Sequence, residues 1–378
     1  MLDVIIAGAG PAGSVAALVL ARSGARVLIV DRDDFPREKL CGDTLNPGAV
    51  RLLGTLGLTG GALAAAKPLC GMVVTGPRTS VRATYGEGVA GLALRRRDLD
   101  AWLLNTAIQA GARFEPGWQV RGPLVEAQRG TPVVRGLLLG RTGQASELRV
   151  PAQFTIAADG RRSRVASRLG LCRPMTWPRR WAYGAYASNV AGMQDLGEMH
   201  IRPGWYLGLA PMPDGLTNVC VVTSPGRGAA APMEMIRRAI AREPSMAPRF
   251  AHVEWAEGVQ VLGPLATEVT AFGVRGLLLA GDASGFVDPM TGDGLHLAMQ
   301  SAVLAAEHTM VALATGVLAG VVEDFSRAHH MRFSAKLRFN RLMRRLVDAP
   351  GAVDAAGFSA VLMPGLVRHA IRYAGDVA

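Results

Sequence analysis

The sequence predicts an α/β protein in which a domain built on a parallel sheet is interrupted by a mostly antiparallel sheet and followed by C-terminal helices. Three observations predict this class. The chain has 378 residues, 49% of them hydrophobic and 19% charged, which is enough apolar material for two packed domains. Two glycine-rich turns, one at the N-terminus and one at Gly281, each follow a short apolar strand and precede an apolar helix. Alternating segments typical of strands lie between these turns.

The N-terminal segment is a predicted β-α-β unit. Val4–Ala7 is a short apolar strand, Ser14–Ser23 is a helix rich in Ala and Leu, and Arg26–Val30 is a second strand. The first turn has the pattern G-x-G-x-x-G in Gly8-Ala9-Gly10-Pro11-Ala12-Gly13. This pattern is specific when it lies between a strand and a helix, as it does here.

Each part of this turn has a physical role in binding a dinucleotide. Gly8 permits the tight turn, Gly10 lets the backbone approach a pyrophosphate, and Gly13 lets helix and strand pack closely. The N-terminus of the helix offers unpaired N–H groups and partial positive charge to the phosphates. Asp31, at the end of the second strand, is placed to accept hydrogen bonds from ribose hydroxyls.

The remaining elements follow from composition and alternation. Helices are expected at Pro47–Leu58, Arg96–Gly111, Met233–Arg242 and Gly294–Thr315, and from Ser326 onward. Strands are expected within Gly71–Tyr85 and 114–158, and at Trp181–Val190, Gly197–Ile201, Trp205–Ala210, Thr217–Thr223 and Leu277–Ala280. This order predicts two domains that the chain enters more than once.

Composition argues against several other classes of protein. The 41 Lys and Arg against 30 Asp and Glu give a net charge of +11, but the basic residues are scattered and aromatic residues make up only 6%, so nucleic-acid binding is not expected. The four Cys and seven His show no metal-ligand spacing and no disulfide framework, so no metal is expected. The N-terminus lacks the basic region of a secretory signal, and we expect a cytoplasmic protein.

Two further motifs follow the first in order. Ala158-Asp159-Gly160-Arg161-Arg162-Ser163 comes after a predicted strand, and Leu279-Ala280-Gly281-Asp282-Ala283 continues through Pro289, Gly292 and Gly294. Over residues 1–320 this set resembles the FAD-dependent family that includes para-hydroxybenzoate hydroxylase, the flavin-dependent halogenases and the geranylgeranyl reductases. The loop Phe35–Asp43 and the segment Thr291–His296 are most similar to the geranylgeranyl reductase-like group.

The resemblance implies non-covalently bound FAD as the cofactor. Asp282 would hold a ribityl or ribose hydroxyl, and Gly292 and Gly294 would turn backbone N–H groups toward the pyrimidine end of the flavin, where negative charge develops on reduction. The motifs and the resemblance together place FAD contacts at Gly8, Gly10, Ala12, Gly13, Asp31, Arg32, Cys41, Gly42, Thr44, Arg96, Val120, Asp159, Gly281, Asp282, Gly292, Gly294 and Leu295.

The substrate pocket is expected along the predicted strand Trp205–Ala210. Geranylgeranyl reductases carry a Tyr-x-Trp-x-Phe-Pro strand facing the substrate, whereas this chain has Gly208 and Ala210 in the Trp and Phe places, which would widen the pocket. Because side chains alternate along a strand, only one of Trp205 and Tyr206 can face it. The expected pocket residues are Trp205, Tyr206, Gly208, Ala210 and Pro289.

Two side chains are weak candidates for a catalytic role. Cys41 would lie beside the flavin, although a free Cys more often packs as a small buried hydrophobe. His296 follows the flavin-facing glycines, although a helix residue at that point can also face the core. For both residues, packing is favoured over catalysis.

The sequence therefore predicts a FAD-dependent oxidoreductase. Only one dinucleotide fingerprint is present, so NAD(P)H is expected as an electron donor that binds transiently without a domain of its own. The favoured reaction is a monooxygenation that hydroxylates or epoxidises a largely apolar small molecule. The alternatives are a reductase that saturates prenyl double bonds, a flavin-dependent halogenase, and a flavin-binding protein without redox turnover.

The domains are expected to be discontinuous. The FAD-binding domain would comprise residues 1–70, 96–170 and 266–325, and the substrate domain would comprise residues 71–95 and 171–265. C-terminal helices would follow at residues 326–378.

The C-terminal tail carries a basic amphipathic pattern. Phe339, Leu342, Met343, Leu346 and Val347 form an apolar stripe at helical spacing, with arginines on the other faces. Such a helix can lie on a membrane surface. Packing of the stripe on its own domain is favoured over membrane contact.

Overall fold

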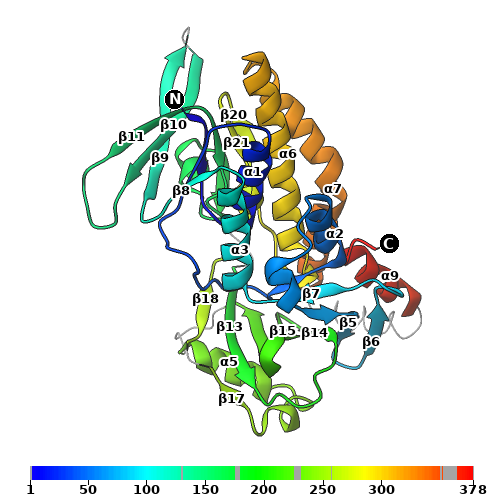
Figure 1. The fold of residues 1–378 in the computed structure, drawn as a ribbon. Helices are drawn as coiled ribbons and strands as arrows, with labels where there is room; N and C mark the ends of the chain where they lie inside the picture. The colour runs from blue at the N-terminus through cyan, green and yellow to red at the C-terminus, as the bar shows by residue number, and fades with distance from the viewer. Residues whose placement is uncertain are drawn as a thin grey trace.

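The computed structural model in Figure 1 describes residues 2–128, 131–174, 179–224, 231–256, 258–349, 351 and 364–377. Two eight-stranded sheets dominate the described part of the chain, with helices packed against both. The predicted fold class is confirmed.

The first sheet is the parallel sheet of the dinucleotide-binding unit. Its strands run in the order β20-β21-β11-β1-β2-β8, and β1 lies between its parallel neighbours β11 and β2. β21 and β8 extend the parallel part, and β20 adds an antiparallel edge. The bounds are β1 (Leu2–Ala7), β2 (Val27–Val30), β8 (Arg113–Glu115), β11 (Leu148–Ala157), β20 (Gly273–Val274) and β21 (Leu277–Leu279).

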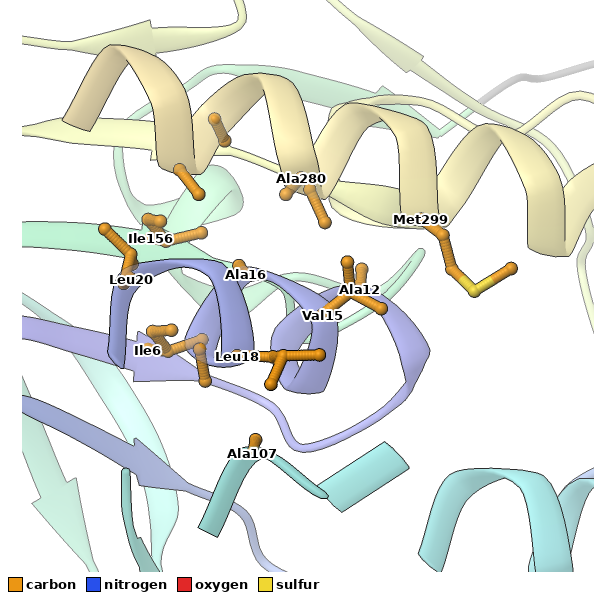
Figure 2. Packing of buried hydrophobic residues seen from close by; sticks show 14 of the residues in the cluster. Ile6, Ala12, Val15, Ala16, Leu18, Leu20, Ala107, Ile156, Ala280 and Met299 are labelled. Atoms are coloured by element: carbon orange, nitrogen blue, oxygen red, sulfur yellow. The ribbon is translucent and has the colours of Figure 1, made fainter. Parts of the chain in front are cut away.

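Alternate residues of β1 pack on two different layers. Val4 and Ile6 join a core formed with α1 (Pro11–Arg22), α3 (Arg96–Gln109) and α6 (Gly294–Thr315). Figure 2 shows α1 lying between α6 and α3 in this core. Ile5 and Ala7 face the ribbon of β9 (Gln119–Gln128) and β10 (Thr131–Gly140), which pairs with β11. Burial on both faces explains why β1 is a continuous apolar run.

The helix α6 is long and apolar enough, by length and composition alone, to cross a membrane. In this structure it packs between α1 and α7 (Val321–Asp348), and Ala302, Ala305 and Ala306 are fully buried. Its apolar character is accounted for by this packing.

The second sheet is almost entirely antiparallel. Its strands run in the order β17-β13-β16-β15-β14-β5-β6, β18 pairs with β13, and only β14 and β5 are parallel among these pairs. The chain enters it first with β5 and β6 and again with β13 to β18, and α5 (Pro232–Ala241) covers one face. The bounds are β5 (Gly71–Thr75), β6 (Ser80–Thr84), β13 (Trp181–Ser188), β14 (Leu196–Arg202), β15 (Trp205–Pro211), β16 (Thr217–Thr223), β17 (Glu254–Trp255) and β18 (Gln260–Leu262).

The C-terminal helices join the two halves of the molecule. α7 packs along α6, and α9 (Pro364–Ala374) packs on β6 of the second sheet, as Figure 1 shows at the C-terminal end. The tail from Ser326 is helical as predicted through Asp348, and the helix begins earlier than expected, at Val321, after Gly320 with a left-handed backbone. The part of the predicted helical tail at 352–363 lies outside the described residues.

The remaining elements are short. The small sheets are β3-β7-β4 and β12-β19. Their bounds, and those of the other helices and 3-10 turns, are β3 (Thr44–Leu45), β4 (Lys67–Leu69), β7 (Gly91–Ala93), β12 (Cys172–Pro174), β19 (Thr267–Val269), α2 (Pro47–Thr55), α4 (Arg164–Arg168), η1 (Gly61–Ala65), η2 (Pro213–Gly215), η3 (Pro248–Phe250), η4 (Gly281–Ser284) and η5 (Pro289–Thr291).

Candidate active site

A mostly apolar cavity of about 290 Å³ lies where the two sheets and the C-terminal helices meet. It is lined by the turn after β1, the loop before β3, strand β15, the segment after β21, and helices α7 and α9. Of the predicted FAD contacts, it brings together Gly10, Ala12, Cys41, Gly42, Thr44, Arg96, Asp282, Gly292, Gly294 and Leu295.

The turn after β1 is fixed by glycine and by Asp31. Gly8 has φ of 95°, and a Cβ there would collide with the carbonyl oxygen of Ala158. The carboxylate of Asp31 accepts a hydrogen bond from the Ala9 N–H at 2.7 Å. The turn therefore presents the uncapped N-terminus of α1 to the cavity at Gly10 and Ala12, where its N–H groups can bind phosphate.

Asp282 lies in η4, just after β21, and lines the cavity. No hydrogen bond from the described residues reaches this carboxylate, and burial raises its pKa, opposed by the positive charges of Lys39 and Arg96. A half-buried carboxylate that the protein leaves without a donor suits a ligand hydroxyl. With the helix N-termini at Gly10 and Gly294, these residues fit FAD, whose ribityl chain supplies hydroxyls and whose pyrophosphate supplies the anion.

Arg96 and Lys39 give the cavity its positive charge. Arg96 starts α3 and is buried against Asp100, with a nitrogen–oxygen distance of 2.8 Å. Burial would lower the pKa of Arg96, but Asp100 holds it above its usual range. Burial lowers the pKa of Lys39, and Arg96 and Arg37 lower it further. The sequence motifs did not single out Lys39 as a site residue, although it is one of three lysines beside 38 arginines.

The Cys41 loop is held by a buried polar cluster around Asp43. Asp43 has φ of 54°, and its carboxylate accepts hydrogen bonds from Asn218 Nδ2 at 2.8 Å and from the Tyr186 hydroxyl. Asn218 also donates to the Cys41 carbonyl at 3.0 Å. These bonds tie the loop to the second sheet and fix Cys41 at the cavity wall.

The Asp43 cluster gives a testable pH dependence. Burial raises the pKa of Asp43 to about 6, although Tyr186, Asn218 and Arg96 oppose the shift. The folded state therefore binds a proton more tightly than the unfolded state, and its stability falls as the pH rises from about 4 to about 6. Asp43→Asn lacks this titration, so its free energy of unfolding relative to the natural protein should rise by about 2 kcal/mol between pH 4 and pH 7. Urea unfolding of both proteins measures this, and a difference independent of pH contradicts it.

Strand β15 forms one wall of the cavity. Tyr206, Gly208 and Ala210 line it, as does Pro289 from η5. The prediction that Trp205 lines the pocket is wrong. Its side chain packs with the hydrophobic cluster on the α5 face, because neighbouring residues of a strand point to opposite sides.

Tyr206 is anchored behind this wall by buried charges. Its hydroxyl donates to Asp288, which pairs with the fully buried Arg180 at 3.3 Å. Arg180 also pairs with Asp348 at the end of α7 at 2.6 Å. This series of side-chain contacts links β15, the segment before Pro289 and α7.

Several expected contacts lie beside the cavity rather than on its wall. The side chain of His296 pairs with Asp376, with Nδ1 2.7 Å from a carboxylate oxygen, and it does not line the cavity. This position gives no support to a catalytic role for His296. Asp159 accepts a hydrogen bond from the Arg164 N–H at 2.9 Å. The others that do not line it are Gly8, Gly13, Asp31, Gly281, the exposed Arg32, and Val120, which is buried in the core beside β9.

The C-terminal helices complete the cavity, which the sequence did not indicate. Phe339 and Met343 of α7 and Val367, Ala370 and Ile371 of α9 line it. Packing was the favoured interpretation of the apolar stripe, and these contacts show that two of its residues line the cavity. Leu342 belongs to the same stripe but does not pack on the domain, because 62% of its surface is exposed.

Comparison with known proteins defines the class. A family model described as an FAD binding domain matches residues 1–316. Menaquinone reductase of Mycolicibacterium smegmatis is 28% identical over 99% of this chain and 91% of its own. Digeranylgeranylglycerophospholipid reductase 1 of Methanopyrus kandleri is 30% identical over 82% of this chain and 81% of its own.

Solved structures share the fold. The flavin-dependent brominase Bmp2 superposes with a TM-score of 0.85 at 20% identity, covering 99% of this chain and 93% of its own. A geranylgeranyl bacteriochlorophyll reductase-like protein from Thermoplasma acidophilum has a TM-score of 0.77 at 22% identity, covering 92% of this chain and 87% of its own.

The fold and the site together define a FAD-dependent oxidoreductase. The chain belongs to the FAD-binding domain family, and its relatives include geranylgeranyl and menaquinone reductases. The predicted resemblance is confirmed.

Proposed function

We propose that this protein is a reductase that saturates carbon–carbon double bonds in a polyprenyl chain, with electrons from NAD(P)H delivered through FAD. The observation that carries the proposal is the pair of reductase relatives, whose named substrates, a digeranylgeranyl phospholipid and menaquinone, share a polyprenyl chain. The monooxygenase favoured from the sequence gains no comparable support from them.

The cavity suits such a substrate. Its walls at Met72, Val74, Phe339 and Met343 are apolar, and it extends from the Cys41 loop to α9. A polyprenyl chain has no hydrogen-bonding groups, so it is recognised by apolar burial alone.

The residues that line the cavity at Gly10, Asp282 and Gly294 would hold FAD, which, once reduced by NAD(P)H, would supply a hydride to one carbon of the double bond. The other carbon takes a proton, which we assign to the Sγ of Cys41. Burial raises the pKa of this thiol, so it stays protonated near neutral pH. The positive charge of Arg96 favours the thiolate left behind, which regains a proton from solvent.

One observation favours a second candidate, the monooxygenase. Gly208 and Ala210 leave the β15 wall without the large aromatic side chains that the prenyl reductases carry there. The wider space suits a broader substrate than a linear chain.

Anaerobic reoxidation of the flavin separates the two candidates. The FAD-loaded protein is reduced with a stoichiometric amount of dithionite under argon and mixed with a digeranylgeranyl phospholipid, with the fully saturated phospholipid as control. A reductase oxidises its flavin on adding the unsaturated lipid but not the saturated one. Reoxidation that requires oxygen in every case would exclude the reductase.

The β15 wall gives a second test. A Cβ at Gly208 would lie 3.7 Å from Met199 Cε, an ordinary contact, so Gly208→Ala should leave turnover nearly unchanged. Gly208→Trp should overfill the cavity and lower turnover by roughly 5- to 150-fold, the equivalent of about 1–3 kcal/mol, with FAD content unchanged. Unchanged turnover in Gly208→Trp would show that the substrate does not occupy this wall. Loss of FAD would show that the strand supports the fold instead.

A further inference from the structure

Two helices beside the cavity carry exposed arginines. In the C-terminal half of α7 these are Arg338, Arg341 and Arg345, and on α9 they are Arg368 and Arg372. None of the five pairs with an acidic side chain among the described residues. Unpaired arginines on neighbouring helices leave a local positive potential.

The two helices lie side by side. The rings of Phe339 and Tyr373 are 5.2 Å apart in an edge-to-face contact, and Lys336 Nζ donates to the Ala374 carbonyl at 3.2 Å. We call the exposed side chains of Arg338, Arg341, Leu342, Arg345, Leu366, Arg368 and Arg372 the basic helix face. The opposite sides of the same two helices line the cavity.

The basic helix face also exposes large apolar side chains. Leu342 and Leu366 are 62% and 61% exposed, among the most exposed large apolar residues in the described part of the chain. Leu342 belongs to the apolar stripe of α7, yet it points to solvent. A surface that combines arginine with exposed leucine matches the headgroup region of an anionic bilayer, where arginine meets phosphate and leucine meets acyl chains.

We propose that the basic helix face docks this protein on an anionic membrane surface, which places the α7–α9 wall of the cavity against the bilayer. This inference rests on the proposed function, because a polyprenyl lipid resides in the membrane and has to pass from it into the cavity. Arginines draw the protein to the headgroups, and the leucines insert at the interface. The lipid then reaches the cavity without crossing water.

Vesicle co-sedimentation of the full-length, FAD-loaded protein tests the proposal. The probes are vesicles of phosphatidylglycerol mixed with phosphatidylcholine, and vesicles of phosphatidylcholine alone. The test variant is Arg338→Gln/Arg341→Gln/Arg345→Gln. The control is Arg149→Gln/Arg164→Gln/Arg168→Gln, which removes the same charge from exposed positions on β11 and α4. α4 packs on the opposite face of the first sheet from α6 and α7.

The natural protein and the control should bind the anionic vesicles alike. The test variant should bind them about 100-fold more weakly, since each arginine near the surface contributes roughly fivefold. Salt should weaken binding of the natural protein. Equal binding by test and control variants would overturn the proposal, as would equal binding to both kinds of vesicle.

Leu342→Ser tests the apolar part separately and should weaken binding without changing its dependence on salt. No arm of this experiment involves turnover. A protein that binds the vesicles through this face but fails to reduce polyprenyl lipids would refute the proposed function alone, and the reverse result would refute the docking alone.

Discussion

Cys41→Ala is expected to lower turnover of a polyprenyl substrate by about 10²- to 10⁴-fold, the range that general acid catalysis contributes. Cys41 lines the cavity, and the positive charge of Arg96, which also lines it, favours the thiolate that remains after proton transfer. Alanine keeps the packing volume nearly unchanged and removes the proton. Steady-state turnover with FAD content measured in the same sample checks the prediction.

Cys220→Ala is the matched control. Cys220 also lines the cavity, and burial raises the pKa of its thiol to about 12, but among the described residues no arginine charge opposes that rise. Turnover in this variant should stay within a few-fold of the natural protein, because only packing changes. If both variants retain turnover, Cys41 only packs beside the flavin, and the proton comes from elsewhere.

Asp282→Ala is expected to weaken FAD binding by roughly 10- to 150-fold, corresponding to about 1.5–3 kcal/mol for a charge-assisted hydrogen bond. The carboxylate has no donor within the described protein, so its removal should leave the apoprotein at least as stable as before. Titration of the apoprotein with FAD and urea unfolding of the same sample measure the two effects.

Asp293→Ala should give the opposite pattern. Asp293 is buried and accepts hydrogen bonds from Asn340 at 3.1 Å and from the Thr291 hydroxyl at 2.7 Å. Its removal leaves these donors unpaired and should lower the free energy of unfolding by about 1–3 kcal/mol, with a smaller effect on FAD affinity. Equal loss of FAD affinity in both variants would mean that the flavin lies elsewhere.

Local patterns explain why the sequence predicted the cofactor side of the site. The β1 turn, β21 and α6 are each defined by residues close in sequence, and the expected bounds of α6 match the structure residue for residue. Strand alternation placed Gly208 and Ala210 on one face, and the same alternation puts Tyr206 on that face and Trp205 on the opposite one, as the structure has them.

The substrate side depends on contacts between distant parts of the chain. Asn218 reaches the Cys41 loop, and α9 reaches β6, across separations that no local pattern encodes. The stripe on α7 predicted an apolar contact but not its partner, which proved to be the cavity. The only sequence feature that indicated Lys39 as a site residue was that a lysine, rare in this chain, lies in a loop already assigned to the flavin.

The mass of the product tests the central claim most directly. The FAD-loaded protein is incubated in air with NADPH and a digeranylgeranyl phospholipid, and the lipid is extracted and analysed by mass spectrometry. The account predicts a gain of two hydrogens for each double bond reduced, with no oxygen added. A product that gains one oxygen atom, with its double bonds otherwise intact, would contradict it.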